Sequence, residues 1–120
     1  MENPKLPRDA GSAVFAILWK YQVRPERLRE FERIYGPGGD WAQFFAQGKG
    51  YLGTALLADP ERSGRYFTLD YWVSQEAFKR FREQNKARYE AIDQRCAALT
   101  EREARLGSFL CHGPVARGQR

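Results

Sequence analysis

The sequence predicts an α+β fold, in which a four-stranded antiparallel sheet carries two long helical segments on one face. Three observations lead to this fold. Residues 14–23 alternate in the manner of a strand, residues 51–58 and 65–74 flank a turn in the manner of a hairpin, and a helical pattern follows each of these units. The chain has 120 residues and is 42% hydrophobic, which suits a single folded domain.

The first strand is expected over Val14–Val23, where both alternating sets are apolar at the start, so both faces are covered there. Pro25 then stands at the first position of a helix, with the acidic Glu26 in its first turn. Apolar residues follow at helical spacing until Gly36 ends the helix. They are Leu28, Phe31, Ile34 and Tyr35.

A short second helix is expected after the glycine- and proline-rich loop at 36–39. We expect Asp40 to cap it and Gly48 to close it. The helix carries three aromatic residues, Trp41, Phe44 and Phe45. They would form either a lid over a pocket or, as is commoner for such a trio, a satellite core.

The predicted hairpin joins a strand at Tyr51–Ala58 to one at 65–74 through a turn at 59–64. The second of these strands has two different faces, because side chains alternate across a strand. One face is suited to burial and carries Phe67, Leu69, Tyr71 and Val73. The other mixes rings with hydrogen-bonding groups, as the wall of a pocket or a polar interface would; it carries Tyr66, Thr68, Asp70 and Trp72.

A long helix is expected from an N-cap at Ser74 to about Leu99, with a length of about 39 Å. Its apolar stripe is interrupted by Asn85. Thr100 and Glu103 have the spacing of a capping box, which indicates one more helical turn. The last strand is expected over residues 105–112.

The resulting order of elements, β-α-β-β-α-β, is that of the ferredoxin-like plan, with one domain over residues 13–113 and flexible tails at 1–12 and 114–120. One face of the sheet would carry no helix. Its residues are too apolar to face water; they are Ala16, Leu18, Phe67, Leu69 and Tyr71. A second copy of the sheet would cover them, so we expect a homodimer.

Composition argues against several classes of protein. The net charge of +5 is spread among mixed signs and does not form the basic stripe of a DNA-binding protein. No segment resembles a secretory signal or is apolar enough to span a bilayer, so we expect a cytoplasmic protein. Cys96, Cys111 and the one histidine, His112, have no metal-binding spacing, and there is no phosphate-binding glycine motif. We expect no metal, no cofactor, no nucleic acid and no membrane partner.

Three motifs resemble those of the antibiotic biosynthesis monooxygenase-like branch of the dimeric α+β barrel proteins, and the resemblance covers about residues 14–111. They are Tyr21-x-Val23-x-Pro25-Glu26, Gly50-Tyr51-x-Gly53-Thr54, and Thr68-x-Asp70-x-Trp72-x-Ser74 leading to Phe78. The resemblance implies that two sheets pack face to face into a barrel and that each subunit keeps a pocket between its sheet and its helices. It indicates the fold more specifically than the activity.

Members of that family differ in chemistry. Some oxidise phenolic polyketides or quinols with O₂ and no cofactor. Others degrade haem with an Asn on the first strand, a Trp at the end of the third and a His on the second long helix. Here the Trp position is Trp72, the Asn position falls near Trp19, and the second long helix has no histidine. The resemblance therefore argues against haem degradation.

Ten residues are candidates for a site. The catalytic candidates are Asp70, Trp72 and Asn85, and the ligand-binding candidates are Trp19, Tyr21, Thr54, Thr68, Tyr89, Trp41 and Phe45. A carboxylate under the helices would have a raised pKa and suit a general base, but Asp70 also suits an ion pair with one of the many arginines. Trp72 also suits the core, Asn85 also suits a bond to a buried backbone group, and a Thr54–Thr68 pair also suits sheet stabilisation.

Three functions fit these features. The first is a cofactor-independent monooxygenase acting on a small phenol or quinol, in which a base deprotonates the substrate and the anion reduces O₂. The second is a non-catalytic dimeric protein that binds a small aromatic ligand. The third is an RNA-binding module of the same strand order, against which stand the charge of Asp70, the length of the second helix and the hidden sheet face.

Overall fold

The computed structural model describes residues 13–113, so the predicted tails at 1–12 and 114–120 lie outside the described residues. The elements follow in the order β1 (Val14–Val23), a 3₁₀ turn (Pro25–Arg27), α1 (Leu28–Tyr35), α2 (Asp40–Phe45), β2 (Tyr51–Ala58), β3 (Arg65–Trp72), α3 (Gln75–Gln84), α4 (Lys86–Cys96), a second 3₁₀ turn (Ala97–Leu99) and β4 (Thr100–Cys111).

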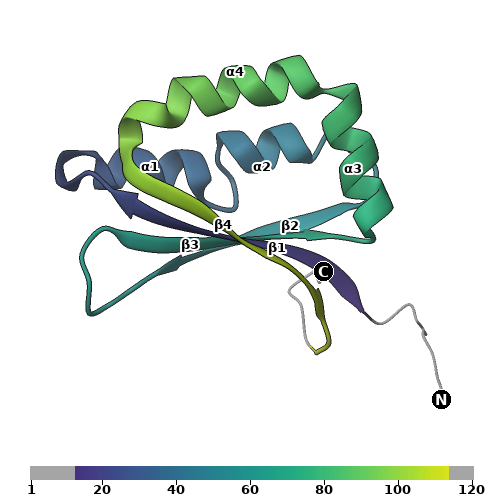
Figure 1. Cartoon of the computed structure of the whole chain (residues 1–120), viewed down its shortest axis with the longest axis horizontal. Coiled ribbons are helices and arrows are strands. Elements are labelled where there is room, and N and C mark those ends of the chain that lie inside the picture. The colour runs from purple at the N-terminus through teal and green to yellow at the C-terminus, as the bar shows by residue number, and fades with distance from the viewer. Residues whose placement is uncertain (1–12, 114–120) are drawn as a thin grey trace.

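The four strands form one antiparallel sheet in the order β2-β3-β1-β4. All the helices lie on the same side of it, and the other face carries none within the described chain (Figure 1). The ferredoxin-like α+β fold predicted from the order of elements is thereby confirmed. The β2–β3 hairpin is also confirmed, with Thr54 opposite Asp70 in its register.

The N-terminus of α3 has the predicted cap. The Ser74 hydroxyl accepts a hydrogen bond of 3.1 Å from the backbone N–H of Ala77, which satisfies one of the free donors of the first turn. The prediction for α2 was wrong in one detail. Gly39 holds the N-cap position, and Asp40 instead pairs with Arg95 at 3.2 Å and Arg33 at 3.8 Å, which ties α2 to α4 and α1.

The expected single helix of about 39 Å is broken at Asn85, where the backbone leaves the helical region with φ −127° and ψ 29°. The backbone N–H and the side-chain amide of Asn85 both donate to the Phe81 carbonyl, at 3.0 and 2.9 Å. This side chain competes with the helical hydrogen bonds, as asparagine often does. Helices α3 and α4 consequently meet at a sharp bend (Figure 1).

The capping-box spacing at Thr100 and Glu103 predicted a helical turn, and this prediction was also wrong. Thr100 begins β4 and pairs with Val23, while Glu103 pairs with Tyr21. Pairing along the central strand β1 outweighs the local capping signal, because local preferences are weak compared with sheet formation.

The core lies between the helices and the covered face of the sheet. Its largest fully buried side chains are Trp72, Phe31, Leu99 and Val23. Phe44 and Phe45 of α2 pack on Phe81, with ring centroids 4.9 and 6.1 Å away. The aromatic trio of α2 therefore belongs to the main core, and not to a separate satellite core.

The helix-free face is apolar. Phe67, Leu69 and Tyr71 are half-buried there. Leu57, which lies opposite Phe67, and Phe109, which lies opposite Ala16, remain 47% and 51% exposed. Among the described residues, no helix is both long and apolar enough to cross a membrane.

Candidate functional site

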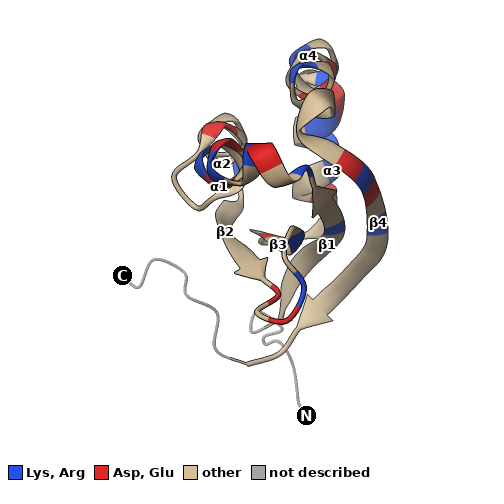
Figure 2. Cartoon of the chain, turned by 90° about the vertical axis from the view of Figure 1, so that its left-hand side faces the viewer, with Lys and Arg blue, Asp and Glu red and all other residues tan. Residues whose placement is uncertain are grey.

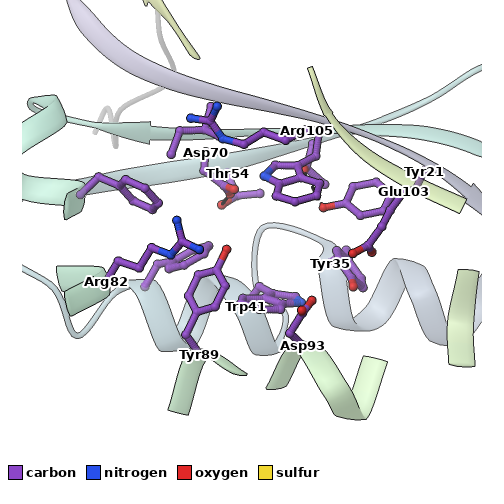
Figure 3. A pocket seen from close by; sticks show the side chains of 15 residues that line it. Tyr21, Tyr35, Trp41, Thr54, Asp70, Arg82, Tyr89, Asp93, Glu103 and Arg105 are labelled. Carbon is purple, nitrogen blue, oxygen red and sulfur yellow. Dashed lines mark hydrogen bonds between the residues drawn. The ribbon is translucent and has the colours of Figure 1, made fainter. Parts of the chain in front are cut away.

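A cavity of about 220 Å³ lies between the covered face of the sheet and the helices (Figure 3). All four strands and all four α-helices contribute to it. It is lined by Ile17, Trp19, Tyr21, Tyr35, Trp41, Phe45, Thr54, Thr68, Asp70, Phe78, Arg82, Tyr89, Asp93, Glu103 and Arg105. Seven of these fifteen residues are aromatic and seven are polar or charged, so the cavity offers both ring faces and hydrogen-bonding groups to a small molecule.

Asp70 is held in the sheet wall of the cavity by a short chain of hydrogen bonds. The Thr54 hydroxyl donates to a carboxylate oxygen of Asp70 at 2.7 Å, and the Tyr51 hydroxyl lies 2.5 Å from the Thr54 oxygen. Thr54 has only one hydroxyl proton, so the Tyr51 hydroxyl donates to Thr54 when Asp70 is ionised. The two hydroxyls therefore orient the carboxylate from one side.

Burial raises the pKa of Asp70 to about 6, because a carboxylate removed from water loses solvation; the hydrogen bond from Thr54 opposes this shift in part. Among the described residues, no lysine or arginine forms an ion pair with Asp70. The alternative of an ion-paired structural carboxylate is therefore contradicted within that part of the chain. A carboxylate with a pKa of about 6 can accept a proton near neutral pH.

Tyrosine hydroxyls enter the cavity from opposite sides. Tyr21 of β1 lies with its oxygen 3.4 Å from that of Thr68, and Tyr89 of α4 directs its hydroxyl toward the sheet wall (Figure 3). Burial raises the pKa of both phenols, so both remain protonated at neutral pH and act as hydrogen-bond donors. Trp19 stacks on Tyr21 with ring centroids 6.1 Å apart.

Charged groups occupy the side of the cavity formed by α3, α4 and β4. The guanidinium of Arg82 lies 5.1 Å from the centroid of the Tyr89 ring, in a cation–π contact. Burial raises the pKa of Glu103, and the nearby carboxylate of Asp93 raises it further. Within residues 13–113, no group of His, Cys, Asp and Glu side chains is arranged to hold a metal ion.

The cavity brings together most of the predicted site residues: Trp19, Tyr21, Trp41, Phe45, Thr54, Thr68, Asp70 and Tyr89. Trp72 and Asn85 are not among its lining residues. Trp72 is fully buried in the core, where its ring packs on Tyr51 and Phe81 at 5.4 and 5.5 Å. Asn85 sits at the bend between α3 and α4, with its amide committed to the Phe81 carbonyl. Trp72 therefore packs in the core and Asn85 bonds a backbone group, which are the structural alternatives that the sequence left open for these two residues.

Sequence reasoning missed Arg82, Asp93, Glu103 and Arg105, all of which line the cavity. Asp93 lies four residues after Tyr89 on α4, which is the spacing of one helical face, whereas Arg82 lies on α3, beyond the break at Asn85. That spacing was a usable signal for Asp93. Glu103 and Arg105 pair with Tyr21 and Trp19, so they share the covered face of the sheet. Because a helical turn was expected at Thr100 and Glu103, the strand-like alternation of Glu103 and Arg105 was not recognised.

Two buried donors stand out among the described side chains, because the indole N–H groups of Trp41 and Trp72 have no hydrogen-bond acceptor. Trp41 lines the cavity and is 8% exposed. The indole nitrogen itself is buried close to the side chains of Tyr35 and Cys96, so it does not open onto the cavity.

The family model described as antibiotic biosynthesis monooxygenase matches residues 14–89. No curated protein matches the sequence. Among solved structures, a conserved protein from Methanosarcina mazei Go1 is similar with a TM-score of 0.61 and 11% identity, over 89% of this chain and 99% of that one.

PA3566 from Pseudomonas aeruginosa has a TM-score of 0.57 and 15% identity, over 88% of this chain and 98% of that one. SnoaB, a cofactor-independent oxygenase from Streptomyces nogalater, has a TM-score of 0.55 and 20% identity, over 89% of this chain and 99% of that one. At these identities the likeness establishes the fold.

Proposed function

Because the chain belongs to the antibiotic biosynthesis monooxygenase family, we propose that it is a cofactor-independent monooxygenase acting on a small phenol or quinol. The observation that carries the proposal is the half-buried Asp70, which has a raised pKa, has no ion pair among the described residues and lines a cavity with aromatic walls. The fold that the chain shares with SnoaB, a cofactor-independent oxygenase, supports it.

Asp70 acts as the general base. It takes the proton of the phenol, and the phenolate that results is electron-rich enough to reduce O₂. A C–O bond then forms between O₂ and the ring carbon para to the oxygen, or, in a quinol, between O₂ and an ortho carbon that carries hydrogen. Loss of the proton from that carbon and cleavage of the O–O bond release hydroxide, which takes the proton held by Asp70. One phenol or quinol and one O₂ thus give one quinone and one water, and no outside reductant is used.

The remaining lining residues bind and orient. Trp19 and Phe45 offer faces for the ring of the substrate, and the hydroxyls of Tyr21 and Tyr89 donate to its oxygen atoms. The aromatic walls beside Asp70 limit the water around the substrate, which lengthens the life of a reactive anion and strengthens each electrostatic contact. Thr54 and Tyr51 hold the carboxylate oxygen in place throughout.

A homodimer through the helix-free face remains part of the proposal. Leu57 and Phe109 are large apolar side chains that are about half exposed on this face. With the half-buried Phe67, Leu69 and Tyr71 they form an apolar surface of the kind that a second sheet covers.

The experiment measures O₂ consumption by the purified protein with a panel of naphthols and quinols, beside the melting temperature. Wild-type protein should consume O₂, and Asp70→Asn should slow consumption by about 10²–10⁴-fold without loss of fold. Glu26→Gln, at an exposed carboxylate outside the cavity, is the control and should leave the rate unchanged. If the wild type consumes none of the panel, the alternative of a non-catalytic protein that binds a small aromatic ligand replaces the enzyme.

A further inference from the structure

A second hollow adjoins the cavity on the side of α3, α4 and β4. It has a volume of about 530 Å³ and shares Phe78, Arg82, Tyr89 and Arg105 with the cavity. The cavity alone is smaller than the sites that usually hold drug-sized ligands, whereas the two spaces together fall within that range. A ligand of two or more rings would therefore extend from the cavity into this outer groove.

The charges change sign along this path. Lining residues found only in the cavity include the carboxylates Asp70, Asp93 and Glu103. The shared residues Arg82 and Arg105 come next, and the outer groove adds Lys79 and Lys86. The outer groove also contains two carboxylates, Glu83 and Glu90, so its lining carries a net positive charge. Figure 2 shows charged residues of both signs on α3, α4 and the neighbouring half of β4, as well as on α1.

The four cations of the outer groove are free to bind a ligand. Among the described residues, no ion pair is formed by any of these four side chains, which are Arg82, Arg105, Lys79 and Lys86. The groove also has an apolar wall from Phe15 and Phe78. Unpaired guanidinium groups beside aromatic side chains are suited to a planar molecule that ends in a carboxylate.

We propose that the substrate is a planar hydroxyaromatic carboxylate, bound with its hydroxyl at Asp70 and its carboxylate in the outer groove between Arg82 and Arg105. This inference rests on the proposed function, since it assigns the hydroxyl to the same base. The reverse orientation is disfavoured, because the substrate carboxylate would then lie among Asp70, Asp93 and Glu103. The charge gradient thus selects both the class of substrate and its direction.

Binding of two matched probes tests the proposal without any turnover. The probes are 6-hydroxy-2-naphthoate and 6-hydroxy-2-naphthamide, which have the same shape and carry the hydroxyl and the second group at opposite ends. Isothermal titration calorimetry at neutral pH should show that the naphthoate binds about tenfold more tightly. This preference should be lost in the Arg82→Gln and Arg105→Gln double variant, whose melting temperature is measured beside it.

Arg80→Gln is the control, because Arg80 lies on the same helix, is exposed and lines neither space. It should keep the preference. A second measurement needs no variant: raising NaCl from about 0.05 to about 0.5 M should weaken binding of the naphthoate and leave the naphthamide unchanged.

Equal affinity of the two probes for the wild type, or a preference that survives in the folded double variant, overturns the proposal. Neither result depends on O₂ consumption. A naphthoate preference without oxidation of any quinol would overturn only the enzyme assignment, and oxidation of neutral quinols without a naphthoate preference would overturn only the assignment of the outer groove.

Discussion

Thr54 and Asp70 lie directly opposite each other on β2 and β3, and the hydroxyl of Thr54 donates a 2.7 Å hydrogen bond to the carboxylate of Asp70. The bond stabilises the charged form of Asp70 while burial destabilises it, so the two effects oppose each other. Burial is the larger, and the pKa of Asp70 is raised to about 6. This pair sets the pH range in which the carboxylate is ionised.

Removing the hydroxyl of Thr54 should therefore move the pH dependence. In Thr54→Val the carboxylate loses a charge-assisted hydrogen bond, so the pKa of Asp70 should rise further, by about one unit or more. The midpoint of the pH–rate profile should move upward by the same amount. Thr54→Ser keeps the donor and should keep the profile. An unchanged midpoint in Thr54→Val would mean that another group is the base.

Asp70 should also make folding stability depend on pH. Its pKa is raised from 3.8 in the unfolded chain to about 6 in the folded one, so between these values the folded protein binds more protons. Stability should therefore fall as the pH rises from about 4 to about 6, and the loss at pH 7 should be about 2–3 kcal/mol. Urea unfolding of wild type and Asp70→Asn across this range measures it. The variant should lack this component and be the more stable protein at pH 7.

Trp72 is expected to matter for stability more than for ligand binding. Its ring is fully buried against Tyr51 and Phe81, and its indole N–H has no acceptor among the described residues. Trp72→Phe loses packing but also removes an unsatisfied donor, so the free energy of unfolding should drop by about 1–3 kcal/mol. Calorimetry with 6-hydroxy-2-naphthoate should give an affinity within about twofold of the wild type. A large loss of affinity in a folded variant would place Trp72 in the site.

Much of the fold follows from local signals in the sequence. The alternation of Val14–Val23, the turn at 59–64 and the Ser74 cap each act over a few residues, and each predicted its element correctly. The errors have two causes, one local and one distant. Asn85 breaks the long helix through its own side chain, whereas Thr100 enters the sheet because β1 offers a partner.

In the candidate site, too, local patterns in the sequence predicted some features, whereas others depend on how distant strands pair. Asp70 and Thr68 could be placed on the covered face of β3 by alternation alone. The Thr54–Asp70 hydrogen bond could not, because it depends on the register of β2 against β3, and a bulge shifts that register between Tyr51 and Gly53. The positions of Glu103 and Arg105 likewise depend on where β4 begins.

The last prediction concerns the helix-free face. Leu69 is half-buried at the centre of the apolar surface that a second copy would cover. Leu69→Asp would bury an unpaired charge in a dimer, which is far more costly than leaving it in water, so the dimer should dissociate or unfold. Leu110→Asp is the matched control, because Leu110 is 64% exposed and pairs with Phe15, whose side chain points to the helices. Sedimentation velocity at micromolar concentration should show a dimer for the wild type and for Leu110→Asp, and a smaller or unfolded species for Leu69→Asp. A wild-type monomer at that concentration would leave the apolar face without its proposed partner and contradict the dimer.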